Sequence, residues 1–316
     1  DLQELLKNNC SEAEIKKFEK KNELDTAVML GELRFRANFY KTLNGLAAVL
    51  RRVETKIPLM EDLNLPQVLF SLLDAHKGLV LVTGPTGSGK TTTLYSCLNT
   101  LNTAESKIIT VEDPIEYQMP RINQTQVKSE IGFTFSSGLR SLMRQDPDII
   151  MVGEIRDLET AEMAIQAALT GHLVISTLHT NDAPAAITRM LELGVAPYLI
   201  KATLLGVMAQ RLVRTFCPHC RYDIEPDLDG WAELVYPWGV EPPVKMASAA
   251  GCQECREIGF KGRAWLYELL TLSDCVKQLV VGHADAGEIR KAGMQAGMRT
   301  LRLSGAEKVA KGETSI

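Results

Sequence analysis

The run from Gly84 to Thr91 constrains this chain more than any other feature, because it prescribes a loop and the elements on either side of it. The run reads Gly-Pro-Thr-Gly-Ser-Gly-Lys-Thr and fits G-x-x-x-x-G-K-[ST] at every fixed position. An apolar run at 79–83 predicts a buried parallel strand before it, and residues 91–98 predict a helix after it. This order of elements predicts a phosphate-binding loop (P-loop).

The P-loop has the chemistry to hold ATP. Its glycines let backbone N–H groups turn toward phosphate oxygens, and the following helix adds the positive end of its dipole. Lys90 is predicted to reach the β- and γ-phosphates, and the Thr91 hydroxyl to bind Mg²⁺. The alternative is a glycine-rich turn without a ligand. The residues predicted to bind the nucleotide are Gly84, Pro85, Thr86, Gly87, Ser88, Gly89, Lys90, Thr91 and Thr92.

Composition limits the class of protein. The chain has 316 residues, 45% of them hydrophobic and 23% charged, which is ordinary for a globular protein of about two domains. A net charge of −4 argues against nucleic acid as a partner. We see no long apolar stretch and no signal pattern, and we expect a cytosolic protein. The first residue is Asp1 and the last residues are polar, so we expect a piece of a longer protein.

Ahead of the P-loop, the sequence predicts a small α+β piece. Residues 11–22 predict a charged surface helix, and residues 32–40 and 45–53 predict two strands with turn chemistry at Asn44-Gly45 between them. Residues 56–66 contain two prolines and predict a linker.

Beyond the linker, acids and a histidine follow successive predicted strands. Asp113 and Glu116 come after the second strand, Glu154 after the third and His179 after the fourth. The carboxyl ends of parallel strands meet at one edge of a sheet, where ligands collect. These side chains are therefore expected beside the P-loop, in place for phosphoryl transfer. The four strands are predicted at 79–83, 108–111, 149–152 and 173–177.

The metal and base roles among these acids are less clear. In most P-loop enzymes an Asp follows the third strand, but here Gly153 takes that place and Glu154 comes next. We favour Glu154 as the carboxylate that polarises the attacking water, with Glu116 or Asp113 assisting. The alternatives are a solvated loop acid at Glu154 and a structural histidine at His179.

Two C-x-x-C pairs predict a metal site. Cys217 and Cys220 form one pair, Cys252 and Cys255 the other, and 31 residues lie between the pairs. Four thiolates suit a closed tetrahedral Zn²⁺ site of a structural kind. Disulfides and a site without metal are the alternatives. Prolines at 226, 237, 242 and 243 predict little regular structure between the pairs.

Four ordered motifs resemble those of the secretion ATPases of type II secretion and type IV pilus systems. They lie at 84–93, 111–116, 144–157 and 170–181, and correspond to that family's Walker A, Asp box, Walker B and His box. The resemblance implies an α/β fold with RecA-like ATPase domains in a homohexameric ring. It implies ATP hydrolysis that drives assembly of a pilus or pseudopilus at the bacterial inner membrane.

The resemblance also implies domains and residue roles. Glu154 becomes the catalytic carboxylate, Glu116 its Asp-box partner and His179 a sensor of the nucleotide state. The N-terminal piece resembles a PAS-like domain that supplies arginines to the nucleotide, with Arg36 and Arg51 as candidates; surface strand charges are the alternative. The implied domains are a partial PAS-like domain with linker at 1–60, the ATPase domain at 61–215, the zinc-binding insert at 216–260 and a C-terminal helical part at 261–316.

Within the family, the direction of the motor is open. The four cysteines and residues 123–127 resemble assembly and secretion ATPases, whereas residues 32–60 look closer to retraction ATPases. We favour assembly or secretion and keep retraction or DNA uptake as the alternative. An inner-membrane platform protein is the implied partner, with peripheral membrane association through it. A RecA-like nucleic-acid motor and a zinc module with a vestigial P-loop are less favoured, since aromatic residues are 6% of the chain and every acid is present.

Overall fold

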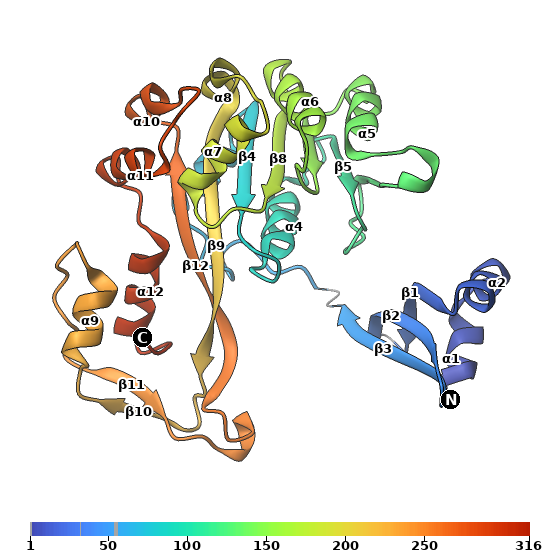
Figure 1. The fold of residues 1–316 in the computed structure, drawn as a ribbon, viewed down its shortest axis with the longest axis horizontal. Coiled ribbons are helices and arrows are strands. Elements are labelled where there is room, and N and C mark those ends of the chain that lie inside the picture. The colour runs from blue at the N-terminus through green and yellow to red at the C-terminus, as the bar shows by residue number, and fades with distance from the viewer. Residues whose placement is uncertain (1, 32, 54–55) are drawn as a thin grey trace. The chain divides into compact units, whose positions relative to one another are not determined.

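The computed structural model describes residues 2–31, 33–53 and 56–316. The chain divides into two compact units, residues 1–57 and 58–316 (Figure 1). None of the helices in the described ranges is long and apolar enough to cross a membrane.

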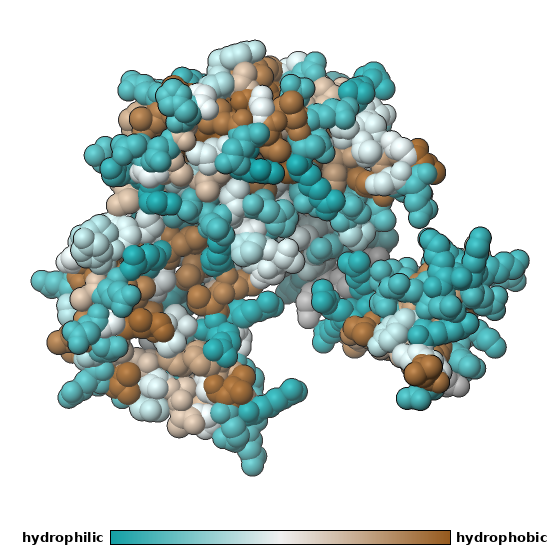
Figure 2. All heavy atoms as spheres, in the orientation of Figure 1, coloured by the Kyte–Doolittle hydropathy of each residue, from teal (hydrophilic) through white to brown (hydrophobic). Residues whose placement is uncertain are grey.

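The first unit is a three-stranded antiparallel sheet with helices on one face. Its sheet order is β1-β2-β3, and a capping box of Ser11 and Glu14 begins its second helix. Phe18, Val28 and Phe39 are buried in its core. In the view of Figure 2 most of its visible surface is hydrophilic. Its elements are α1 (Leu2–Asn9), α2 (Glu12–Lys21), β1 (Glu23–Leu30), β2 (Leu33–Thr42) and β3 (Gly45–Val53).

These elements confirm the helix and both strands predicted for the first unit. The strand predicted from Glu32 begins at Leu33 as β2; Glu32 itself lies outside the described residues. The sequence analysis missed β1, in which Leu24 and Val28 are buried among exposed and half-buried neighbours.

The second unit contains a seven-stranded sheet in the order β12-β9-β4-β8-β7-β5-β6. The strands from β9 to β6 run parallel, and β12 is antiparallel to β9. The strands are β4 (Gly78–Thr83), β5 (Ile108–Glu112), β6 (Asn123–Gln126), β7 (Ile149–Val152), β8 (Leu173–Leu178), β9 (Leu204–Phe216) and β12 (Phe260–Thr271). The four strands predicted from the sequence are β4, β5, β7 and β8.

Helices cover this sheet on both faces. All residues of β4, β5, β7 and β8 are buried, although successive residues point to opposite faces. Asp157 and Asp182 cap two of the helices through backbone N–H groups 2.8 and 2.9 Å away. The helices are α3 (Gln67–Leu73), α4 (Lys90–Leu101), α5 (Phe135–Leu142), α6 (Leu158–Leu169), α7 (Ala183–Glu192), α8 (Pro197–Thr203), α10 (Asp274–Leu279), α11 (Ala286–Gln295) and α12 (Leu301–Ala310), with 3₁₀ turns at Ser129–Ile131 and Met143–Gln145.

The segment between the two cysteine pairs has regular structure, which corrects the prediction made from its prolines. Strands β10 (Arg221–Ile224) and β11 (Met246–Ala249) pair with each other, and α9 (Leu228–Val235) lies between them in the chain; a 3₁₀ turn follows at Gln253–Cys255. Pro226 precedes the N-cap of α9 and Pro237 follows its C-cap. Prolines at these positions bound a helix without interrupting it. Trp231 of α9 packs with Ala306 and Val309 of α12.

Residues 261–316 likewise begin differently from their description as a helical part. Residues 260–271 form β12, an edge strand of the main sheet, and α10, α11 and α12 follow it. The sheet order places β12 two strands from β4, which leads into the P-loop, and Tyr267 of β12 lies opposite Gln210 of β9.

Candidate active site

The P-loop joins β4 to α4, as the sequence predicts. Gly84, Gly87 and Gly89 have φ values of +146°, +83° and +88°, a region that residues with a Cβ rarely adopt. Gly89 is the N-cap of α4, and Lys90 and Thr91 begin the helix. Helix N-termini of this kind leave N–H groups that can bind phosphate oxygens, and the prediction that these residues hold a nucleotide stays a prediction.

Lys90 lies against its own loop. Its Nζ donates hydrogen bonds to the carbonyl oxygens of Gly84 (2.6 Å) and Pro85 (3.3 Å). Burial lowers the pKa of the Lys90 ammonium, Glu154 opposes this, and Arg211 adds to it, with a net decrease. Pro85, Thr86 and Gly87 are exposed at the loop tip, and Ser88 is buried. The ammonium therefore lies inside the loop, and its contact with the β- and γ-phosphates stays a prediction.

Glu154, in the loop after β7, and His179, directly after β8, lie together. Glu154 Oε2 is 3.4 Å from His179 Nε2, and Glu154 Oε1 accepts a hydrogen bond from Arg156. Burial raises the pKa of Glu154, but Arg156, His179 and Lys90 outweigh it and hold this pKa below its ordinary value of 4.5. Glu154 is thus a carboxylate at neutral pH and interacts electrostatically with Lys90 of the P-loop.

Backbone contacts fix the position of Glu154. The N–H of Gly153 donates to the carbonyl of Val111 (2.8 Å), and Thr177 Oγ1 donates to the carbonyl of Gly153 (2.7 Å). A Cβ at position 153 would lie 3.3 Å from both Phe135 and the Val111 carbonyl oxygen. A side chain here would require Phe135 or the Val111 backbone to move by a few tenths of an ångström, which favours glycine at the position where most P-loop enzymes have an Asp.

A threonine pair joins the P-loop strand to the segment that carries His179. Thr83 Oγ1 lies 2.7 Å from Thr180 Oγ1 and accepts the Thr180 N–H at 2.9 Å. Arg211 donates to the carbonyl of Asn181 at 2.7 Å. These contacts tie the loop that carries His179 to the base of the P-loop.

The structure places the other predicted residues as follows. Asp113 and Glu116 are exposed in the loop after β5, and Asp113 is close enough to Arg156 to raise the pKa of its guanidinium. The partnership of Glu116 with Glu154 stays a prediction. Arg36 and Arg51 lie in the first unit, directly opposite each other on β2 and β3. Their action on a nucleotide also stays a prediction.

Sequence reasoning missed the buried polar groups that support the P-loop. Gln210 of β9 is fully buried; its Nε2 donates to the carbonyl of Ser88 (2.7 Å) and its Oε1 accepts from Thr93 Oγ1 (2.9 Å). Glu112, the last residue of β5, is also buried and holds the loop that contains Glu116. The available signal was a glutamine or glutamate within an apolar run, which marks a paired polar group in a core.

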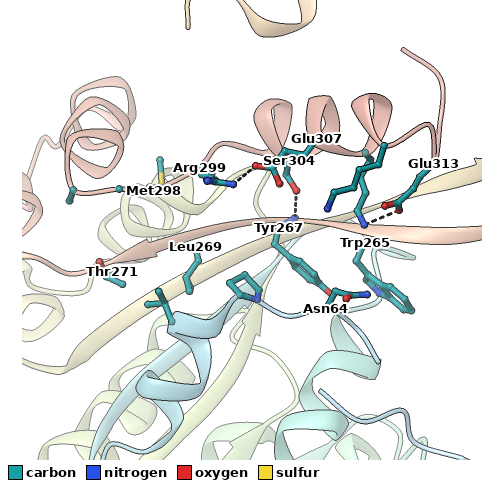
Figure 3. Close-up of a pocket in the computed structure, with 16 residues that line it drawn as sticks. Asn64, Trp265, Tyr267, Leu269, Thr271, Met298, Arg299, Ser304, Glu307 and Glu313 are labelled. Carbon is teal, nitrogen blue, oxygen red and sulfur yellow. Dashed lines mark hydrogen bonds and ion pairs between the residues drawn. The ribbon is translucent and has the colours of Figure 1, made fainter. Parts of the chain in front are cut away.

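A pocket of about 570 Å³ lies along β12, the strand that pairs with β9 (Figure 3). Trp265, Tyr267, Leu269 and Thr271 of β12 line it together with residues of α12, the loop before α12 and the segment 64–68. The Tyr267 N–H donates to Ser304 Oγ at 3.2 Å, as Figure 3 shows. Trp265 also approaches the P-loop, because a Cβ on Gly89 would lie 3.0 Å from its Nε1. Its indole thus lies between the pocket and the P-loop.

The four cysteines converge at the end of β9. All four Sγ atoms lie within 4.8 Å of one another, and the pairs Cys217–Cys252, Cys220–Cys255 and Cys252–Cys255 are 3.8, 3.8 and 3.7 Å apart. Sulfurs in a tetrahedron about 2.3 Å from Zn²⁺ would be about 3.8 Å apart. Backbone N–H groups of Cys252 and Gly259 point at Cys255 Sγ, each at 3.2 Å, and favour a thiolate. The geometry fits a zinc ion.

The fold and the P-loop define a P-loop nucleotide-binding protein with a mixed α/β fold. The model of the family described as Type II/IV secretion system protein matches residues 13–316, and the chain belongs to this family.

Its relatives carry more specific names. The chain is 52% identical over 239 residues to the type IV pilus assembly ATPase TfpB of Acinetobacter baylyi, covering 76% of this chain and 41% of the relative. It is 48% identical over 246 residues to the type II secretion system ATPase E of Vibrio cholerae, covering 78% and 48%. The chain thus spans about half the length of the curated relatives it matches.

A solved structure supports the fold over nearly the whole chain. The pilus retraction motor PilT with bound ADP matches with a TM-score of 0.76 and 31% identity, covering 99% of this chain and 81% of PilT. The predicted membership of the secretion ATPase family is confirmed by these matches.

Proposed function

We propose that this chain is part of an ATP-hydrolysing motor that powers assembly of a type IV pilus or a type II secretion pseudopilus. The observation that carries the proposal is the placement of Glu154 after β7, two strands from the P-loop strand β4, with His179 3.4 Å away and a lowered pKa that Lys90 of the P-loop helps to set. The names of the relatives, pilus assembly and secretion ATPases, support the process. The likeness to a retraction motor keeps retraction as the second candidate.

In the proposed reaction, ATP lies on the P-loop with its β- and γ-phosphates near Lys90. A Mg²⁺ ion held by the Thr91 hydroxyl would neutralise developing charge. Glu154 is an ionised carboxylate and can orient the attacking water and accept its proton. Glu116 would assist Glu154. His179 is 3.4 Å from Glu154 and would sense the loss of the γ-phosphate through that contact.

The arginine pair supports a shared site in a homohexameric ring of RecA-like domains. Arg36 and Arg51 are direct cross-strand neighbours on the sheet face opposite buried Ala37. Like charges placed directly opposite each other disfavour the sheet. A triphosphate bound to a neighbouring subunit would offset this repulsion. In this proposal the first unit acts as a PAS-like domain that supplies the two arginines to that nucleotide.

Zinc on Cys217, Cys220, Cys252 and Cys255 is proposed as a structural ion. It would tie the end of β9 to the start of β12, and so hold β10, α9 and β11 on the main sheet. We further propose that the motor acts on the cytoplasmic side of the inner membrane, associated peripherally through a platform protein. This placement rests on the processes named for the relatives.

The chemistry is tested by phosphate release from ATP and Mg²⁺. Lys90→Ala should lose both turnover and nucleotide affinity, whereas Glu154→Gln should bind ATP and fail to hydrolyse it. Lys291→Ala and Glu159→Gln, which remove exposed charges of the same types elsewhere, are the matched controls. Full turnover by either site variant would refute the assignment. Stimulation by DNA would favour a nucleic-acid motor.

The shared site is tested by mixing two inactive variants. Lys90→Ala retains both arginines, and the double variant Arg36→Ala, Arg51→Ala retains the P-loop. If the arginines act on a neighbour's nucleotide, mixed rings should regain hydrolysis. Arg52→Ala, on the other face of β3, should keep its activity. Activity that is not restored, or that does not fall on dilution, would argue that each chain completes its own site.

A further inference from the structure

A buried tyrosine connects the P-loop helix to the acidic loop after β5. Tyr95 lies on α4 and is fully buried. Its hydroxyl donates to Glu112 Oε2 and accepts the backbone N–H groups of Glu116 and Tyr117, each at 3.2 Å. Gln124 Nε2 lies 3.5 Å from the same oxygen, so the hydroxyl has both its donor and its acceptor capacity used. The hydroxyl is thus a junction between α4, the end of β5 and residues 116–117.

The same loop is fixed from its other side by Gln124 of β6. Its Nε2 donates to Glu112 Oε1 at 3.2 Å and to the Tyr117 carbonyl at 2.8 Å, while its Oε1 accepts the Met119 N–H at 2.8 Å. Thr110 completes the set by donating to Glu112 Oε1 at 2.5 Å. Residues 113–119 are therefore held by buried Tyr95 and half-buried Gln124, although Asp113 and Glu116 are themselves exposed.

The junction lies close to the nucleotide-binding turn. Tyr95 follows Thr91, the proposed Mg²⁺ ligand, by four residues, and residues with that spacing lie on the same face of a helix. Burial raises the pKa of the Tyr95 phenol, and Glu112 raises it further, so the hydroxyl remains a proton donor throughout the physiological range. The helix that begins in the P-loop therefore also sets the position of the acidic loop.

We propose that the Tyr95 hydroxyl is a positioning group that holds residues 113–117 so that Glu116 can act with Glu154 on the ATP bound by the P-loop. This inference rests on the proposed function. Tyr95 acts through the backbone of Glu116, whose N–H its hydroxyl accepts. A purely structural tyrosine would instead affect only stability, independently of Glu116.

Tyr95→Phe tests the proposal, because it removes one oxygen and keeps the ring. A displacement of about 1 Å at a reacting group can cost about 100-fold in rate. We expect kcat for ATP to fall between about 10- and 100-fold, with the KM for ATP and the Kd for ADP changed less than about threefold. Tyr267→Phe is the matched control, since its buried hydroxyl donates to the Leu63 carbonyl at 3.0 Å, and it should keep the wild-type kcat.

A double-mutant cycle separates positioning from stability. In a Glu116→Gln background, Tyr95→Phe should lower kcat by less than about threefold, because the group that it positions is already disabled. The same loss in both backgrounds, or an unchanged kcat in the single variant, would overturn the proposal. If Tyr95→Phe does not fold, Gln124→Met removes the other anchor of the loop and should give the same dependence on Glu116. Wild-type protein without ATP hydrolysis would instead count against the proposed function.

Discussion

Replacing Gly89 by alanine tests whether the P-loop is held against β9 and β12 in the shape described here. Gly89 has a φ of +88°, and an added Cβ would lie 3.0 Å from Trp265 Nε1 and 3.2 Å from Gln210 Nε2. Gln210 cannot withdraw without losing its 2.7 Å hydrogen bond to the Ser88 carbonyl. Gly89→Ala therefore imposes two separate costs, a left-handed backbone and a close contact.

The two costs have different sizes, and Gly87→Ala separates them. A left-handed conformation costs an L-residue about 1–2 kcal/mol, and a methyl group forced into filled space costs about 1–3 kcal/mol. Gly87 has a φ of +83° but nothing within 4 Å of an added Cβ. The free energy of unfolding should therefore fall by about 1–2 kcal/mol for Gly87→Ala and by about 2–5 kcal/mol for Gly89→Ala.

Urea unfolding in the absence of nucleotide measures this difference. Tryptophan fluorescence suits the assay because Trp231, Trp238 and Trp265 all belong to the second unit. Leaving out ATP keeps losses of binding from entering the measured stability. Equal losses for the two variants would show that Gly89 is not packed against Trp265 and Gln210, and would refute the described support of the P-loop.

Three further predictions follow from the site. Nucleotide binding should change the tryptophan fluorescence. Trp265→Phe should remove most of that change, whereas Trp238→Phe should keep it. An undiminished change in Trp265→Phe would contradict the placement of the Trp265 indole beside the P-loop. The pKa of Glu154 is lower in the folded protein than its ordinary value of 4.5, so the stability that its carboxylate contributes is complete above pH 4.5 and is lost as the pH falls through the folded-state pKa. The unfolding temperature of Glu154→Gln should therefore fall less steeply in acid than that of the wild type. Equal acid sensitivity of the two proteins would contradict this. Elemental analysis of the purified protein should find one zinc ion per chain. Cys217→Ser should lose this zinc, whereas a control variant at the exposed Cys275, Cys275→Ser, should retain it. Wild-type protein without zinc would refute the metal site.

The central sheet could be predicted because its signals are local. Strands β4, β5, β7 and β8 are short apolar runs buried on both faces, and each is followed by polar residues at its carboxyl end. The P-loop glycines carry their own conformational signal, and the structure gives all three positive φ values. Strands β9 and β12 were missed because their pairing joins residues far apart in the chain, such as Gln210 and Tyr267.

The prolines between the cysteine pairs show a different limit. Their number suggested irregular structure, but their positions relative to α9 decide the outcome. Pro226 stands just before the N-cap Asp227, and Pro237 just after the C-cap Tyr236. The number of prolines in a segment does not show whether a helix can form there. The positions of the prolines do, because a proline just before or just after a helix leaves its interior hydrogen bonds intact.

The acids at the sheet edge could be located from the sequence, but their roles could not. Glu112 and Glu116 belong to the same short motif, yet Glu112 is buried against Tyr95 while Glu116 is exposed. Which of these carboxylates is exposed thus depends on where β5 ends, and the Tyr95 hydroxyl contacts groups on both sides of that point. A local pattern shows that a loop is acidic, but only the contacts of Tyr95 and Gln124 show what holds it in place.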